Sequence, residues 1–325
     1  MDQGKGLSTQ GVQKTPHVSV VVPAYNVARY IAQTIDSVLG QTFQDFEIIV
    51  VNDGSPDTDA LNGVLARYGD RLRCLCKPNG GLASARNAGV REAHSDLIAF
   101  LDGDELWEPE YLASQLALLR TDASAAAAFT DAVYFGESPF AGKRIAEVVP
   151  FETGRVTIEA VLGGRSNLSY SCLMRRRAIE SVEGYDESLR RVEDWDIYLR
   201  LLLRGETILI NPQPLLRYRR RDDSLSSDLV AMRRAALIVL ARNEITVPSG
   251  SHLLPMIRDL RRHWRADIER ELGRNALAEG SWEQARTHWE ELQKIRPSRR
   301  IGLSLLVGNV SPGLLTFILR RLGRL

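Results

Sequence analysis

The sequence has few cysteines, no excess of either charge and no long hydrophobic run. Three cysteines in 325 residues are too few for a disulfide framework, and Cys74 and Cys76 lack the second pair that a zinc site needs. A formal net charge of +1 gives no bulk attraction to nucleic acid. No segment has the length of a membrane-spanning helix, and the N-terminal segment has no apolar signal core. We therefore expect a cytoplasmic protein without nucleic-acid partners, with at most a peripheral contact on the inner membrane face.

The first half of the chain alternates apolar strands with amphipathic helices. The expected strands cover positions 18–22, 46–51, 72–76 and 97–101, and most of their residues are apolar. Strands that are apolar throughout are typical of a parallel sheet covered on both faces. The predicted fold class is therefore α/β, with a mostly parallel sheet flanked by helices. Further strands are expected at 125–135 and 171–175, with irregular structure over 136–165 between them.

Each of these strands ends in a polar loop, and the carboxyl ends of parallel strands meet at one edge of a sheet, where open α/β folds bind ligands. The side chains brought together in this way are Tyr25, Asn26, Asp53, Lys77, Asp102 and Asp104. Gly103, between two of the carboxylates, lets the backbone turn tightly and approach a ligand. Paired carboxylates favour Mg²⁺ or Mn²⁺ shared with a diphosphate. The alternative is a plain surface turn, because polar residues follow the strands of every α/β protein.

Two further polar stretches lie downstream. Glu193 and Asp194 precede a predicted amphipathic helix, where the helix dipole favours acids, so they are either helix caps or include a general base. Four arginines fall within residues 217–221. They either clamp a diphosphate or lie on a solvated edge strand. The residues alone leave both questions open.

Five segments, in this order and at this spacing, resemble the family 2 glycosyltransferases, which have the GT-A fold. They are residues 18–26 (Val-Ser-Val-Val-Val-Pro-Ala-Tyr-Asn), 51–58 (Val-Asn-Asp-Gly-Ser-Pro-Asp-Thr), 79–89 (Asn-Gly-Gly-Leu-Ala-Ser-Ala-Arg-Asn-Ala-Gly), 101–104 (Leu-Asp-Gly-Asp) and 193–196 (Glu-Asp-Trp-Asp). The resemblance covers residues 17–226, after a flexible lead expected at 1–16. It implies inverting transfer of a sugar from a nucleotide diphosphate sugar, expected to be a UDP-sugar. The implied acceptor is a hydroxyl of a glycan or a lipid-linked molecule in cell-surface polysaccharide synthesis.

The resemblance also implies which residues carry the chemistry. Asp194 would be the catalytic base, and Glu193 and Trp195 would shape the acceptor site. Asp104 would ligate Mn²⁺ or Mg²⁺ directly, with Asp102 near the metal and the ribose. A carboxylate base suits this reaction, because a sugar hydroxyl is a poor nucleophile until its proton is removed.

The donor site is implied in the same way. Its nucleotide-sugar-binding residues would be Pro23, Ala24, Tyr25, Asn26, Asp53, Lys77, Gly81, Arg86, Asp102 and Gly103. Asp53 would accept a hydrogen bond from the base, and Lys77 and Arg86 would flank the base or the phosphates. The diphosphate-binding residues would be Arg219 and Arg221. The family often has a histidine in that loop, where this chain has only arginines and aspartates.

Two other functions fit parts of the pattern: a catalytically silent GT-A domain that acts as a scaffold, and a metal-dependent nucleotidyltransferase. The presence of Asp53, Asp104 and Asp194 speaks against a silent domain, which has no physical need for a metal site and a base. A nucleotidyltransferase needs no base at 193–194.

Residues 227–325 are expected to form a helical region outside the resemblance, with helices at 229–244 and 252–268. One helix pair resembles a tetratricopeptide unit through Leu272, Gly273, Ala285, Trp289, Leu292 and Pro297. Glu269 stands where such a unit would have its first tryptophan, and plain helix packing is the alternative.

The end of the chain is basic and apolar, with no acidic residue after Glu291. An apolar stretch at 301–319 is surrounded by Lys294, Arg296, Arg299, Arg300, Arg320, Arg321 and Arg324. One helical face is expected to carry Leu314, Leu315, Ile318, Leu322 and Leu325. Such an end suits an anionic membrane surface, and a buried C-terminal helix is the alternative.

Overall fold

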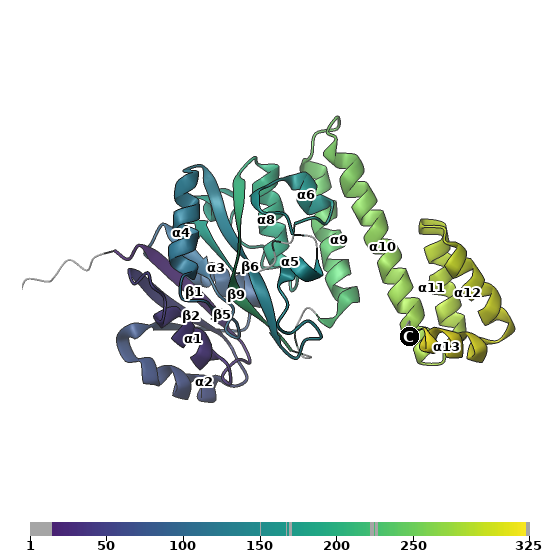
Figure 1. The fold of residues 1–325 in the computed structure, drawn as a ribbon, viewed down its shortest axis with the longest axis horizontal. Helices are drawn as coiled ribbons and strands as arrows, with labels where there is room; N and C mark the ends of the chain where they lie inside the picture. Colours follow the sequence, from purple (N-terminus) through teal and green to yellow (C-terminus); the bar gives the residue numbers. More distant parts are fainter. Residues whose placement is uncertain are drawn as a thin grey trace, which may run out of the picture.

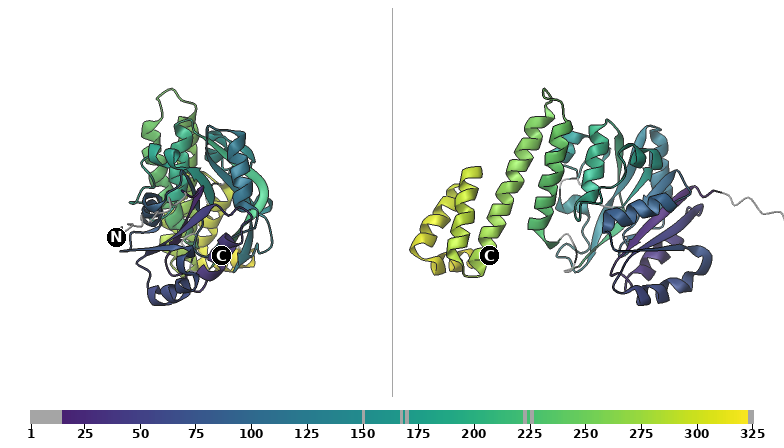
Figure 2. Two further views of the ribbon diagram at one scale, coloured as in Figure 1. Left: turned by 90° about the vertical axis from the view of Figure 1, so that its left-hand side faces the viewer. Right: turned by 180° about the vertical axis from the view of Figure 1, so that it is seen from behind.

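The computed structural model describes residues 15–149, 151–166, 168, 171–221, 224 and 227–322. A sheet with flanking helices comes first, and the helices α9 to α13 follow (Figures 1 and 2). The strands are β1 (Val18–Ala24), β2 (Phe46–Asp53), β3 (Arg73–Lys77), β4 (Leu97–Phe100), β5 (Leu106–Trp107), β6 (Ala125–Gly136), β7 (Gly154–Val156), β8 (Cys172–Arg175) and β9 (Thr207–Arg220). The helices are α1 (Ile31–Leu39), α2 (Thr58–Leu65), α3 (Leu82–Glu92), α4 (Tyr111–Thr121), α5 (Ile145–Val148), α6 (Ile158–Leu162), α7 (Arg176–Ser181), α8 (Glu193–Leu203), α9 (Leu229–Thr246), α10 (Leu253–Ala278), α11 (Trp282–Ile295), α12 (Arg299–Val310) and α13 (Pro312–Arg321). Residues 1–14 of the expected lead, and Arg324 and Leu325 of the basic end, lie outside the described residues.

In the described part of the chain, nine strands form one sheet in the order β3-β2-β1-β4-β8-β6-β9-β5, with β7 paired to β9. Strands β1, β2, β3, β4, β6 and β9 run in one direction, and β5, β7 and β8 run against them. The prediction of a mostly parallel sheet flanked by helices is confirmed. It is interrupted where β8 enters antiparallel between β4 and β6.

The central strands β1 and β4 are buried on both faces, which explains their apolar sequences, whereas the outer strand β3 is largely exposed. On β1, Val20 and Val22 face the core that also contains side chains of α1 and α4. Val21 points to the opposite core, which contains side chains of α3 and α8. Helix α3 comes so close there that a Cβ on Gly89 would lie 2.3 Å from Val21 Cγ1. Successive side chains of the strand thus point to opposite faces of the sheet, and those on both faces are buried.

The second half of the sheet corrects two expectations. Strand β9 pairs with β6 through Arg220, and its other side pairs with β7 and then with β5 only as far as Arg217. The solvated edge strand considered for residues 217–221 therefore holds only in part, because Arg217 is exposed whereas Arg219 and Arg221 contact Asp104. The region 136–165 is more regular than expected, because α5, β7 and α6 form within it. Arg144 anchors this region by donating to buried Asp131 on β6 and to the carbonyl of Pro212.

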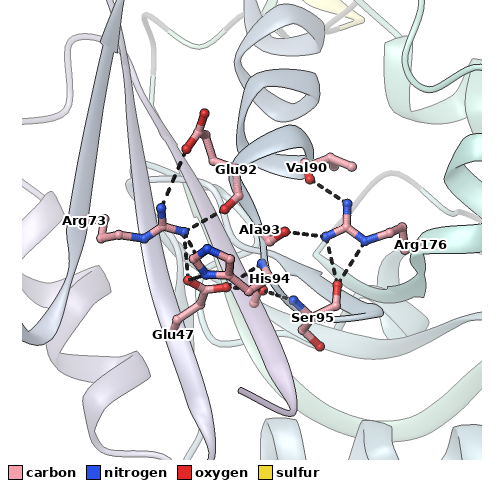
Figure 3. A network of polar contacts seen from close by, with 9 residues as sticks. Glu47, Arg73, Val90, Glu92, Ala93, His94, Ser95 and Arg176 are labelled. Carbon is pink, nitrogen blue, oxygen red and sulfur yellow. Dashed lines mark hydrogen bonds and ion pairs between the residues drawn. The ribbon is translucent and has the colours of Figure 1, made fainter. Parts of the chain in front are cut away.

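A polar network ties α3 to the sheet at the ends of the strands opposite the predicted site (Figure 3). Glu47, near the start of β2, accepts from Arg73 Nη2 and from the backbone N–H of His94, both at 2.8 Å. Arg176 donates to the backbone carbonyls of Val90, Ala93 and Ser95. These carbonyls include the last ones of α3, which lack partners within the helix. The network therefore holds α3 in place by its carboxyl-terminal end.

The C-terminal helices extend away from the sheet. Helix α9 packs beside the sheet domain, α10 lies next to α9, and α11, α12 and α13 gather at the far end of α10 (Figure 1). The helix expected at 252–268 is longer than predicted, because α10 continues to Ala278. Late in α10, Gly273 faces the indole of Trp289, and a Cβ there would lie 2.2 Å from Nε1. None of the helices described is long and apolar enough to cross a membrane.

Candidate functional site

The residues predicted to converge do so at the carboxyl ends of β1 to β4. Asp53 is the last residue of β2, Lys77 is the last residue of β3, and Asp102 follows β4. The first turn of α8 and the end of β9 reach the same edge of the sheet. Three connected clusters result, centred on Asp53, on Arg86 and on Asp104.

The first cluster is a loop folded over the carboxylate of Asp53. Asp53 is 3% exposed and accepts from Lys77 Nζ at 2.5 Å, from the Gly80 amide at 2.9 Å and from the Gly81 amide at 2.7 Å. Gly81 has a φ of +87°, a conformation that favours glycine. The family resemblance implies that Asp53 accepts a hydrogen bond from a base; in the structure its carboxylate orders the loop that follows β3.

The loop after β1 forms a wall against the loop that contains the two aspartates. Tyr25 is half exposed, Ala24 is buried, and Asn26 has a positive φ of 55°. A Cβ on Gly103 would lie 2.9 Å from the carbonyl oxygen of Pro23. Gly103 is therefore needed for the close approach of these two loops, whereas the sequence predicted it for the approach of the backbone to a ligand.

The second cluster is a buried cation between two carboxylates. Arg86 on α3 donates from Nη1 to Glu193 Oε1 at 2.7 Å and from Nη2 to Asp102 Oδ1 at 2.8 Å. Its guanidinium also lies 5.5 Å from the ring centroid of Tyr185. The sequence placed Arg86 beside the base or phosphates, whereas both its terminal nitrogens here engage carboxylates. Arg86 thus joins α3, the loop after β4 and the start of α8, which lie up to 107 positions apart in sequence.

The start of α8 carries backbone strain next to buried acids. Val192 precedes the helix with φ +56° and ψ +24°, a left-handed conformation that a β-branched residue rarely adopts. Burial raises the pKa of Glu193 to about 7, with the Asp194 charge acting in the same direction and Arg86 opposing both. Burial likewise raises the pKa of Asp194 against the influence of Arg86. Asp194 caps the helix only through its Oδ1, which accepts from the Trp195 amide at 2.7 Å.

The third cluster surrounds Asp104. Its carboxylate lies 3.2 Å from Arg221 Nε, and its backbone carbonyl accepts from Arg219 Nε at 2.8 Å. The Arg219 guanidinium stacks 4.4 Å from the ring centroid of Tyr30. Burial raises the pKa of Asp104 to about 6, opposed by Arg221 and reinforced by the nearby charge of Asp102. Both predicted diphosphate-binding arginines therefore lie beside the aspartates.

Sequence reasoning assigned no role to two residues of the site. Glu105 is 3% exposed, and burial together with the charges of Asp102 and Asp104 raises the pKa of its carboxyl well above the ordinary value. The sequence did offer a signal for Glu105, because it is the third acidic residue within positions 102–105. Arg190 lies over the loop at Gly81, where a Cβ would come within 2.7 Å of its Nη1. No pattern in the sequence indicated that contact.

Trp195 links the site to the helical region. Its ring centroid lies 5.3 Å from that of Trp264 on α10, and the two rings are inclined by 59°. The side chain also packs between the core beneath α8 and the core shared with α9 and α10. The predicted acceptor wall at Trp195 therefore adjoins α10.

The residues at Asp104 fit a divalent cation that takes part of its ligands from a donor. No group of three or more metal-ligating side chains occurs among the residues that the structure describes. Asp102 and Asp104 supply two carboxylates, each of which already lies beside an arginine. Mg²⁺ and Mn²⁺ accept oxygen ligands from water and from substrate phosphates, and one or two carboxylates suffice to hold them. Burial and the nearby charge of Asp102 raise the pKa of Asp104, and the opposing charge of Arg221 does not cancel this rise.

A comparison with known protein families shows to which family the chain belongs. The model of glycosyl transferase family 2 matches residues 19–182, just over half of the 325 residues. The chain belongs to this family. The match contains Asp53, Arg86, Asp102 and Asp104, and it ends before Glu193.

Relatives and solved structures agree with the family. The hyaluronan synthase of Pasteurella multocida is 32% identical over 193 residues, which are 58% of this chain and 19% of that protein. The chain spans about a third of the length, or less, of the curated relatives it matches. Staphylococcus aureus TarS 1–349 in complex with UDP-GlcNAc has a TM-score of 0.59 and 18% identity, covering 93% of this chain and 86% of that one. The mannosyltransferase PcManGT of Pyrobaculum calidifontis in complex with GDP-Man and Mn²⁺ has a TM-score of 0.61 and 16% identity, covering 92% and 81%. The fold is the GT-A fold, as predicted.

Proposed function

We propose that this family 2 member is an inverting glycosyltransferase whose catalytic part is residues 17–226. The observation that carries the proposal is the Arg86 bridge, which joins the predicted donor side at Asp102 to the predicted base side at Glu193. A helix-capping role alone does not explain a buried acid at α8 that is connected to the strand-end carboxylates. Helices from residue 227 onward would form a separate region beside the acceptor wall.

Asp194 is the proposed general base. Its raised pKa makes it a stronger base than an exposed aspartate, and it stays next to the Arg86 cation, which keeps its ionised form accessible. It would remove the proton from the acceptor hydroxyl as that oxygen attacks the anomeric carbon, opposite the leaving diphosphate. One carboxylate is sufficient for this in-line displacement, which inverts the anomeric centre.

Asp104 and Asp102 are the proposed ligands of Mn²⁺ or Mg²⁺. When bound, the cation would supply Lewis-acid stabilisation of the leaving diphosphate. Arg219 and Arg221 bring two further positive charges to the same place, and Tyr30 holds Arg219 by stacking. Arg221 would exchange its contact with Asp104 for the diphosphate when the donor binds.

The proposed donor is a nucleotide diphosphate sugar, with UDP as the first nucleotide to test. TarS was solved with UDP-GlcNAc and PcManGT with GDP-Man, so GT-A folds of this shape accommodate both bases. The wall of Pro23 to Asn26 and the Asp53 loop are the proposed nucleoside pocket. The proposed acceptor is a hydroxyl of a glycan or of a lipid-linked molecule, in keeping with the hyaluronan synthase relative.

The test separates the base from the metal site. Calorimetric titration with UDP and with GDP, each with and without Mn²⁺, gives donor binding, and release of nucleotide from UDP-GlcNAc and GDP-mannose gives turnover. Asp194→Asn should lower turnover by about 100-fold or more and leave the Mn²⁺-dependent affinity within about threefold. Asp104→Asn should weaken binding in Mn²⁺ and leave binding without Mn²⁺ unchanged.

The matched control is Asp196→Asn, one position beyond the site on the same helix. Asp196 pairs with Arg200 at 2.6 Å, away from the site. The control should retain turnover. Turnover of the Asp194→Asn variant close to that of the unmodified protein would refute the assignment of the base. Nucleotide affinity that is the same with and without Mn²⁺ would refute the assignment of the metal site.

A further inference from the structure

The last two described helices expose an unusual number of large apolar side chains. Val310 is 86% exposed, Leu306 67% and Phe317 64%. The set of exposed large apolar residues on these helices comprises Leu303, Leu306, Val310, Leu314, Phe317, Ile318 and Leu322. We call this set the apolar face of α12 and α13. Isolated apolar residues on a surface are ordinary, but a contiguous patch marks an interaction site.

The spacing shows that each helix contributes one stripe. On α12, Leu303, Leu306 and Val310 recur at intervals of three and four residues, which places them on one side. Leu314, Phe317 and Ile318 do the same on α13. The two helices contact one another at the far end of the molecule, well away from the sheet (Figure 1). Leu305 and Leu315 enter the core around Trp289, so both stripes face away from that core, on the outside of the C-terminal helices.

The apolar face is separate from the side of these helices that holds the fold together. Leu315 is 3% exposed and packs in the core around Trp289. Gly308 lies against Trp282, where a Cβ would come within 2.0 Å of the ring. The single face predicted from sequence is corrected here, because Leu315 points inward while Leu314 and Ile318 point outward. The helices are thus apolar on two sides, and within the part of the chain that the structure describes only the inner side packs against other residues.

Charge determines which occupant the face fits. Arg299 and Arg300 begin α12, Arg320 and Arg321 end α13, and all four are exposed. Neither helix contains an acidic residue. Two copies of the face would bring eight arginines together without a counter-charge, so self-association is opposed by repulsion. Apolar side chains bordered by arginines instead match the acyl and headgroup layers of an anionic bilayer.

We propose that the apolar face of α12 and α13 docks on the surface of an anionic phospholipid bilayer without crossing it. The apolar stripes would enter the boundary between headgroups and acyl chains, and the four arginines would contact the phosphates. Each basic residue near an anionic surface contributes about 1 kcal/mol, which corresponds to about a fivefold change in binding. The inference is independent of the transferase reaction, since it rests on residues outside the catalytic part.

The experiment is flotation of the full chain with vesicles of phosphatidylcholine alone or with phosphatidylglycerol, at low and high salt. The chain should float with the anionic vesicles only, and high salt should weaken binding. Arg320→Ser with Arg321→Ser should lower the partition coefficient by about 25-fold, the product of two fivefold effects. Leu306→Ser with Phe317→Ser should lower it by at least about tenfold, because burial of each side chain is lost.

The matched control is Ile245→Ser at the end of α9. Ile245 is as exposed as Val310 but lies outside the face, so this variant should float like the unmodified chain. Equal binding to neutral and anionic vesicles, or normal flotation of both double variants, would overturn the proposal. So would sedimentation showing that Leu306 and Phe317 mediate dimerisation while no vesicle binding occurs.

Discussion

Replacing Arg86 with methionine tests the electrostatic design of the site. Methionine keeps most of the length of the side chain and removes the positive charge between Asp102 and Glu193. The two contacts differ in exposure, because the Glu193 side chain is 5% exposed and the Asp102 side chain 36%. We therefore expect a small, constant loss of stability from Asp102 and a pH-dependent loss from Glu193.

The magnitude follows from the pKa of Glu193. This pKa is about 7 in the folded protein against an ordinary value of 4.5. A raised folded pKa means that the contribution of Glu193 to stability is complete below about 4.5 and is lost as pH rises through 7, by roughly 3 kcal/mol in all. Without Arg86 the folded pKa rises further, so the loss continues above 7 at about 1.4 kcal/mol per pH unit.

The expected free energy lost in Arg86→Met is therefore about 1 kcal/mol at pH 6, from the exposed Asp102 contact. It should grow to about 2 kcal/mol at pH 8 and to about 4 kcal/mol at pH 9, within the range found when a buried ion pair loses one partner. Urea denaturation followed by circular dichroism at these three pH values measures it. Arg91→Met, an exposed arginine on the same helix, is the matched control and should change little at any pH. A loss that is the same at pH 6 and pH 9 would refute the reasoning.

Two further predictions concern packing and catalysis. Gly89→Ala should destabilise the protein by about 1–3 kcal/mol in urea denaturation, because the new methyl meets Val21, whereas Gly63→Ala, with open space around it, should stabilise α2 by up to about 1 kcal/mol. The rate constant kcat/KM should keep rising with pH above the range in which an exposed aspartate ionises, because burial raises the pKa of both Glu193 and Asp194 and the proposed base acts only when it is ionised. A profile already flat from pH 5 upward would contradict the assignment of the base.

The fold was predictable because its signal is local. Fully apolar strands indicate a sheet that is buried on both faces. Strand β1 is an example, because its neighbouring residues Val20 and Val21 enter opposite cores. The antiparallel entry of β8 was not predictable, since a short strand of four residues carries no sign of its direction. The length of α10 was underestimated because the helix at 252–268 and the first helix of the pair at Leu272 and Gly273 were predicted separately, whereas one helix runs through both.

The site was predictable to the level of which loops converge. Strand ends placed Asp53 and Asp102 at one edge, and the structure has them there. The sequence did not predict which of the side chains at that edge contact one another. The contact of Arg86 with Glu193 spans 107 positions, and it depends on how α3 and α8 pack. The left-handed backbone at Val192 was equally hidden, because valine is among the residues least expected to adopt it.

Arg86 contacts both Asp102 and Glu193, and it therefore connects the proposed donor and acceptor halves of the site. The charge of Asp102 acts to raise the pKa of both Glu193 and Asp194, and the charge of Arg86 acts to lower it. Any positive charge that arrives beside Asp102 therefore lowers the pKa of the proposed base and favours its ionised, active form. A donor bound together with its cation would bring such a charge. The proposed base would then ionise more readily with the donor in place than without it, which favours donor binding before proton removal from the acceptor.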